Sequence, residues 1–252
     1  MKYYGQSDIG LVRSENQDTF NIQVPFEGAL ISVVCDGMGG AASGALAASL
    51  ACEAFTERLN NNIKAYINSP DDLSQESVQI IDKMLTDAAE LANTVVYEKA
   101  SHEKEHKGMG TTLVASLVIG KFVYVINIGD SRLYRRTSLG FTQITRDHSY
   151  VQALIDIGKI SVEEATHHPN RNIITRAVGT NPEVVPDIYH IIIGEGESIL
   201  LCSDGLCGYV EADEIDRVMT GDVSEKDKVE ELIALAKDAG GRDNITAVVV
   251  TY

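Results

Sequence analysis

Four aspartates lie where an apolar, strand-like segment of the sequence begins or ends. They are Asp36 after ALISVVC, Asp130 after KFVYVINIG, Asp204 after ESILLCS and Asp243 before NITAVVVTY. If the last of these segments runs antiparallel to segment 29–35 or 197–203, its start lies beside their ends. Acidic side chains from distant parts of the chain then meet at one rim of a sheet, and Asp18, at the start of segment 18–24, can join them.

Converging carboxylates predict a metal site. They repel one another, so they are stable only when they are protonated, paired with Lys or Arg, or bound to cations. A set of oxygen donors without His or Cys favours hard ions, magnesium or manganese, over zinc. Gly37 and Gly205 follow two of the acids, and a missing side chain leaves room for hydrated ions and a substrate. A single Asp-Gly pair is commonly a turn, so the prediction depends on the recurrence of the pattern.

The elements that position these acids are mostly strands joined by short turns. Hairpins are predicted around Gly120 and around residues 194–196, and helices over 41–60, over 74–100 and after the capping residues Ser161 and Ser224. Strands are expected at 18–24, 29–35, 111–119, 121–129, 131–136, 141–145, 187–193, 197–203 and 244–252. Hairpins between strands, with helices inserted between groups of strands, favour antiparallel sheets covered by helices, which is an α+β architecture.

Composition narrows the class of protein. The chain has 252 residues, 44% of them hydrophobic, and a net charge of −16, which argues against a nucleic-acid partner. No apolar stretch reaches the roughly 18 residues of a membrane helix, and no signal-peptide block opens the sequence. The four cysteines form no CxxC pair, as expected for buried thiols in a reducing compartment. We therefore expect a cytoplasmic protein with a single domain over residues 1–252.

Six short motifs are similar to those of the type-2C metal-dependent protein serine/threonine phosphatase family, in particular its bacterial members. In the family's order they are RSENQD (13–18), DGMGG (36–40), GMGTT (108–112), GDSR (129–132), SDGL (203–206) and GRDNIT (241–246). The resemblance spans nearly the whole chain. It implies an αββα sandwich, with two antiparallel β-sheets flanked by helical layers, a metal site at one edge, and a flap segment at about 147–179 that shapes substrate access.

The resemblance also implies the ligands of the metal ions. Two divalent cations, manganese or magnesium, are expected, with Asp36 bridging both and the carbonyl of Gly37 binding one of them. Asp204 and Asp243 would hold the other ion. Asp130, together with Asp204, resembles the ligands of a weaker third ion. These roles belong to the family's pattern and are carried onto the matching positions of this sequence.

Two further residues match catalytic positions of the family, and two positions depart from it. Arg13 matches the guanidinium that binds the substrate phosphate, and Asp18 matches the acid that positions a metal-bound water. Gln17 and Met38 stand where animal members carry Glu and His. Because that His is the proposed general acid, its loss leaves the proton donor open, and we expect a metal-bound water to protonate the leaving oxygen.

These matches predict an enzyme that hydrolyses phosphoserine and phosphothreonine on proteins, with a cognate serine/threonine kinase as its counterpart and a monomeric chain. One alternative is a phosphoprotein-binding regulatory domain on the same scaffold without turnover. A second is a phosphohydrolase with an aspartyl-phosphate intermediate. That chemistry commonly uses a DxD sequence after the first strand, and Asp36-Gly37-Met38 lacks it.

Overall fold

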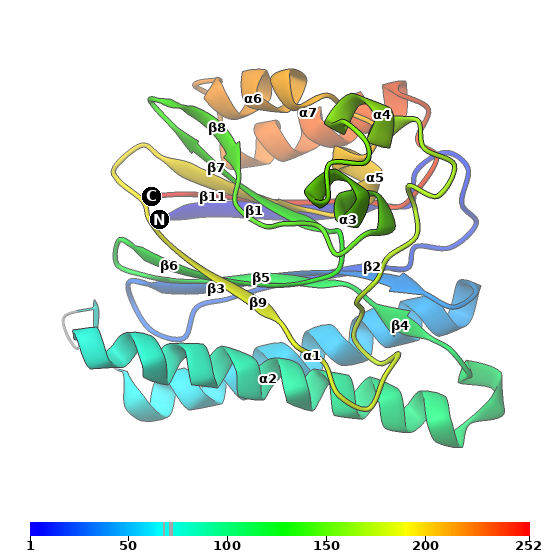
Figure 1. Cartoon of the computed structure of the whole chain (residues 1–252). Helices are drawn as coiled ribbons and strands as arrows, with labels where there is room; N and C mark the ends of the chain where they lie inside the picture. The colour runs from blue at the N-terminus through cyan, green and yellow to red at the C-terminus, as the bar shows by residue number, and fades with distance from the viewer. Residues whose placement is uncertain (68, 71–72) are drawn as a thin grey trace.

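In the computed structural model, which describes residues 1–67, 69–70 and 73–252, two antiparallel sheets pack face to face between layers of helices (Figure 1). The first sheet has the order β1 (Lys2–Asp8), β11 (Ile245–Thr251), β10 (Ser198–Cys202), β7 (Arg132–Thr137) and β8 (Gly140–Gln143). The second has the order β2 (Asp18–Gln23), β3 (Ala29–Met38), β5 (Leu113–Ile119), β6 (Phe122–Ile128) and β9 (Asp187–Ile192), and β4 (Gly110–Thr111) pairs with β3. The α+β prediction and the αββα sandwich are confirmed.

Helices cover the outer face of each sheet. The long helices α1 (Ala41–Tyr66) and α2 (Gln75–His102) lie on the second sheet, and α6 (Ala212–Thr220) and α7 (Glu225–Asp238) lie on the first (Figure 1). Three apolar clusters result, one between the sheets and one beneath each helical layer. Strands such as β5 are buried on both faces, which explains why their sequences are continuous apolar runs without alternation.

The predicted helix starts at Ser161 and Ser224 are confirmed. Ser161 caps α4 (Val162–Thr166), where its hydroxyl accepts a hydrogen bond from the Glu164 amide at 3.1 Å. The Glu164 carboxylate in turn accepts from the Ser161 amide at 2.7 Å, completing a capping box. Ser224 caps α7 through the amide of Asp227 at 3.2 Å. Shorter helical segments are α3 (Tyr150–Asp156), α5 (Asp204–Cys207) and the 3-10 turn Lys104–His106.

Two expectations about strands are wrong. Strand β3 does not end before Asp36 but continues to Met38, because Gly37 and Met38 pair with Thr111 and Gly110 of β4. Segments 187–193 and 197–203 do not form a hairpin. Strand β9 pairs with β6 in the second sheet, and β10 pairs with β7 and β11 in the first.

The second correction has a simple physical reason. The inward side chains of β9 and those of β10 contribute to the same apolar cluster between the sheets. The two strands therefore face each other across that cluster and do not lie side by side.

Within the described residues, no helix has both the length and the apolarity to cross a membrane.

Candidate active site

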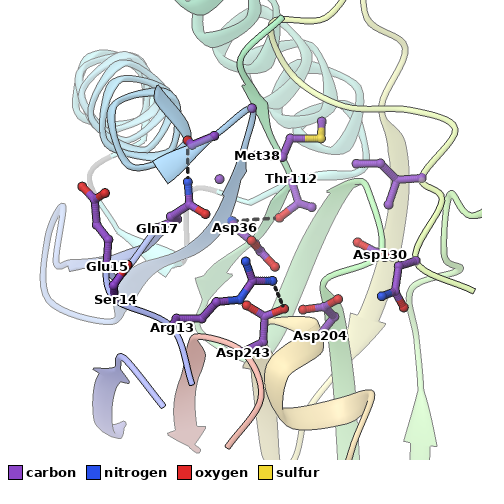
Figure 2. A pocket seen from close by; sticks show the side chains of 15 residues that line it. Arg13, Ser14, Glu15, Gln17, Asp36, Met38, Thr112, Asp130, Asp204 and Asp243 are labelled. Carbon is purple, nitrogen blue, oxygen red and sulfur yellow. Dashed lines mark hydrogen bonds and ion pairs between the residues drawn. The ribbon is translucent and has the colours of Figure 1, made fainter. Parts of the chain in front are cut away.

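A cavity of about 370 Å³ opens at one end of the sandwich, and the predicted site residues converge on it (Figure 2). All of them except Asp18 line its wall, namely Arg13, Asp36, Gly37, Asp130, Asp204 and Asp243. In Figure 2 the carboxylates of Asp36, Asp204 and Asp243 lie around a shared space, with Arg13 beside them. The cavity is therefore strongly acidic, and Arg13 is the one cationic side chain among the described residues of its wall.

The sheet topology brings the acids together. Asp204 opens α5 directly after β10, and Asp243 lies just before β11. These two strands are antiparallel, with Cys202 opposite Ala247, so the end of one lies beside the start of the other. This is the arrangement that the sequence predicts. Asp36 and Asp130 come from the second sheet, the former within β3 and the latter after β6.

The backbone of Asp36 is fixed by two threonines, Thr111 at the end of β4 and Thr112 between β4 and β5. Its amide donates to the Thr112 hydroxyl at 3.0 Å, and its carbonyl accepts from the Thr112 amide and the Thr111 hydroxyl, both at 2.8 Å. The Thr112 hydroxyl also lies 2.7 Å from that of Ser131, next to Asp130. Thr112 thus links two of the acid-bearing segments, a role that the motif GMGTT did not reveal.

The glycines that follow Asp36 and Asp204 are required by close backbone contacts. A Cβ on Gly37 would lie 2.0 Å from the carbonyl oxygen of Gly44 in α1, and a Cβ on Gly205 would lie 1.9 Å from that of Asn244. Neither distance is compatible with a side chain. In both places the missing side chain lets a second segment approach an acid-bearing strand end.

Asp18 lies behind the cavity wall, opposite Asp36 in the β2–β3 register. Its Oδ2 accepts hydrogen bonds from the hydroxyls of Ser203 and Thr246, each at 2.7 Å. Its Oδ1 is buried and has no hydrogen-bond partner among the described residues. Burial, only partly offset by these hydroxyls, raises the pKa of Asp18 to about 7. The preceding residue, Gln17, lines the cavity instead.

Ionising the acidic side chains of the cavity wall is electrostatically unfavourable. Burial, with further contributions from neighbouring carboxylates, raises the pKa of Asp130 to about 8 and that of Asp36 well above its usual range. The same cause raises the pKa of Asp204, whose carboxyl group is close enough to that of Asp36 to share a hydrogen bond. Two carboxyl groups at that distance need a proton or a cation between them. Buried oxygen donors of this kind fit hard divalent cations.

Arg13 supplies positive charge at the cavity. Its Nη2 donates to Oδ2 of Asp243 at 2.7 Å, and the Arg13 side chain is 48% exposed. Part of the wall comes from the segment 147–179, which places Asn172 and Ile174 against the cavity. The sequence predicts this segment near the site but does not single out these two residues.

Comparison with known proteins places this fold among the protein phosphatases. The family profile "Protein phosphatase 2C" matches residues 12–244, and the chain belongs to this family. It is 33% identical over 245 residues to the protein phosphatase PhpP of Streptococcus pneumoniae, covering 97% of this chain and 95% of the relative.

Solved structures agree with this assignment. The serine/threonine phosphatase Stp1 of Staphylococcus aureus superimposes with a TM-score of 0.87 at 33% identity, covering 100% of this chain and 95% of the other. The catalytic domain of the serine/threonine protein phosphatase PstP, solved in complex with two manganese ions, gives a TM-score of 0.82 at 33% identity, with 98% and 96% coverage. The chain is thus a bacterial-type member of the family.

Proposed function

We propose that the protein hydrolyses phosphoserine and phosphothreonine esters on other proteins with the help of two divalent cations. The observation that carries this proposal is the convergence of Asp36 in β3, Asp204 after β10 and Asp243 before β11 on one cavity that also contains Arg13. The solved structures of proteins named as serine/threonine phosphatases support the same reaction. The manganese-bound PstP structure supports the type of cofactor.

The chain would hold these cations with the residues that the sequence predicts. Asp36 would bridge the pair, the carbonyl of Gly37 would bind one ion, and Asp204 and Asp243 would hold the other, with Asp130 available to a weaker third ion. When bound, manganese or magnesium neutralises the carboxylates, attracts the phosphate dianion and lowers the pKa of the attacking water. Asp18, the register partner of Asp36 on the neighbouring strand β2, would orient water in the cavity.

Other residues would bind the substrate and limit its access. The Arg13 guanidinium would bind two phosphate oxygens in a charge-assisted contact. Residues 147–179 would act as a flap, because Asn172 and Ile174 already form one cavity wall. Met38 lines the cavity as well, and none of the described lining residues is a histidine. We therefore assign protonation of the leaving oxygen to water in the cavity.

The wider setting of this activity is also a proposal. The substrates would be proteins phosphorylated by a serine/threonine kinase, in the cytoplasm, and the chain would act as a monomeric single catalytic domain over residues 1–252. The alternative, a phosphoprotein-binding domain without turnover, is less favoured. A domain that had lost catalysis would be expected to lose a ligand, whereas the full acid set is present here.

The proposed function is tested by phosphate release from a phosphothreonine peptide. Release is expected with manganese, should stop on addition of EDTA, and should return when manganese is restored in excess. Activity that EDTA leaves unchanged would contradict the metal-dependent mechanism. Peptide binding without release would instead support the regulatory alternative.

Replacing Arg13 by alanine is expected to raise KM about 10- to 100-fold. The reason is that a hydrogen bond to a charged group contributes roughly 1.5–3 kcal/mol, and each 1.4 kcal/mol is about a tenfold change in affinity. Arg13→Lys should give an intermediate KM, because lysine keeps the charge but not the two-pronged geometry. Steady-state kinetics on the phosphothreonine peptide measure both. A large fall in kcat with unchanged KM would show that Arg13 does not act through substrate binding.

A further inference from the structure

His148 lies at the base of the flap segment and contacts the loop that carries Asp130. The Gly129 amide donates to Nδ1 of His148 at 3.0 Å, and the His148 amide donates back to the Gly129 carbonyl at 2.8 Å. The His148 side chain is only 7% exposed. Because Gly129 directly precedes Asp130, this reciprocal pair of hydrogen bonds fixes the backbone immediately before a cavity acid.

The surroundings of His148 select one form of its ring. Since Nδ1 accepts from an amide, the ring proton is on Nε2, which lies 3.1 Å from Oδ2 of Asp187 and donates to it. Arg176 donates to Oδ1 of Asp187 at 2.7 Å, and the same Nη1 lies 2.9 Å from Nε2 of His148. Burial first, and this cation in addition, lower the pKa of His148. A neutral ring with a fixed tautomer therefore suits the Gly129 contact.

The same histidine joins the two ends of the flap segment. The Thr175 amide donates to the His148 carbonyl at 2.8 Å, and Ser149 forms an antiparallel bridge with Ile174. Ile174 and the nearby Asn172 line the cavity. The flap wall of the cavity is thus attached, through one or two residues, to the backbone of His148.

A second contact holds the Asp130 loop from its other side. Arg132 donates to both carboxylate oxygens of Asp147, to Oδ1 at 3.0 Å and to Oδ2 with a shortest distance of 2.7 Å. The adjacent residues Asp147 and His148 therefore hold Arg132 and Gly129, which flank Asp130 in the sequence. Any shift of the flap base would move Asp130 as well.

We propose that His148 is a positioning residue that holds Asp130 and the flap wall of the cavity in one common arrangement. The proposal rests on the proposed phosphatase function, since it concerns the geometry of that site. It predicts that His148 acts on catalysis through Asp130 and on substrate binding through the flap, without touching the reacting atoms.

The test is a double-mutant cycle of His148→Ala and Asp130→Asn, read as kcat and KM with manganese. Two substrates are used, the phosphothreonine peptide and the small ester p-nitrophenyl phosphate. His148→Ala is expected to lower kcat/KM about 10- to 100-fold, the range found for residues that orient metal ligands. If it acts through Asp130, the double variant should have the same kcat as Asp130→Asn alone. The increase in KM should be larger for the peptide than for the small ester.

Two variants separate positioning from general stability. His148→Asn keeps an acceptor for the Gly129 amide and should recover most of the activity lost in His148→Ala. His190 is the matched control, because it also pairs with a carboxylate, Asp82, at 2.7 Å but lies away from the cavity lining. His190→Ala should leave kcat and KM unchanged.

The outcomes are distinct. The proposal would be overturned if the fold-losses in kcat of His148→Ala and Asp130→Asn multiply in the double variant. It would also be overturned if His148→Asn is as inactive as His148→Ala. If His148→Ala does not fold, Asp187→Asn replaces it in the cycle, because it weakens the Nε2 contact that orients the ring. If the wild-type protein is inactive on both substrates, the proposed function itself is refuted. If the wild-type protein is active but the effects of His148→Ala and Asp130→Asn on kcat are independent, only the role of His148 is refuted.

Discussion

Replacing Asp36 by asparagine is expected to lower kcat/KM by at least about 10³-fold while raising the stability of the metal-free protein. The loss follows because Asp36 is the proposed shared ligand, metal ions contribute several kcal/mol to the transition state, and each 1.36 kcal/mol is tenfold in rate. The gain follows because burial and neighbouring acids raise the pKa of Asp36 well above its usual range. An amide removes that unfavourable charge while keeping the shape of the side chain.

The loss of kcat/KM and the gain in stability can both be measured on the same preparation. Phosphate release under excess manganese gives kcat/KM, and thermal unfolding in EDTA gives the stability. Asp216→Asn is the matched control, because Asp216 pairs with Arg136 at 2.7 Å on α6, away from the cavity lining. It should lose a little stability and keep its activity. An Asp36→Asn protein that retains a tenth of the wild-type kcat/KM would remove Asp36 from the proposed ligand set.

The convergence of the acids was predictable because it follows from short-range rules. Apolar strands that end at acids, and antiparallel pairing of neighbours, suffice to bring Asp204 and Asp243 together, and the β10–β11 register has this form. The capping serines Ser161 and Ser224 were predictable for the same reason, since a cap involves residues three positions apart. These features depend on the local chain or on adjacent strands.

The features that the sequence did not reveal depend on contacts between distant segments. Strand β3 extends past Asp36 because β4, more than seventy residues later, pairs with it. Segments 187–193 and 197–203 resemble a hairpin locally, but each packs into a different sheet. Asn172 and Ile174 reach the cavity only through the path of the flap segment. Along α2, Leu91 is 40% exposed, whereas the small side chains of Ala88, Ala89 and Ala92 are buried.

The metal-free protein is expected to lose stability as the pH rises from about 4 to about 8. The pKa of an aspartate in the unfolded chain is about 3.9, whereas in the folded state the pKa of Asp18 is raised to about 7 and that of Asp130 to about 8. Asp36 and Asp204 are shifted in the same direction. Between these limits the folded protein binds more protons than the unfolded chain, so the free energy of unfolding falls as the pH rises.

Other carboxylates act in a different pH range. Burial raises the pKa values of Asp8 and Asp187, but the hydrogen bonds and charges of their partners, chiefly Lys237 and Arg176, together outweigh burial and lower both pKa values. Their contribution is present above the unfolded pKa and is lost only in stronger acid. His148 acts in the opposite direction, because its lowered pKa favours the folded state as the pH rises toward 6.5. The decline from about pH 4 to pH 8 therefore reports the acids in and behind the cavity wall, reduced by the contribution of His148. Because each pKa unit corresponds to about 1.36 kcal/mol, its total is on the order of several kcal/mol.

Manganese should reverse this decline, because a cation that binds only the folded protein stabilises it and binds best when the carboxylates are ionised. Urea unfolding at pH 5, 6.5 and 8, with EDTA or with manganese, measures both effects. Manganese should stabilise the protein most at pH 8 and least at pH 5. Asp18→Asn should flatten the EDTA curve, since it removes a buried acid whose Oδ1 has no partner among the described residues. If the stability of the metal-free protein instead rises toward pH 8, ionising these acids does not destabilise the folded state. The electrostatic argument for a cation site would then be wrong.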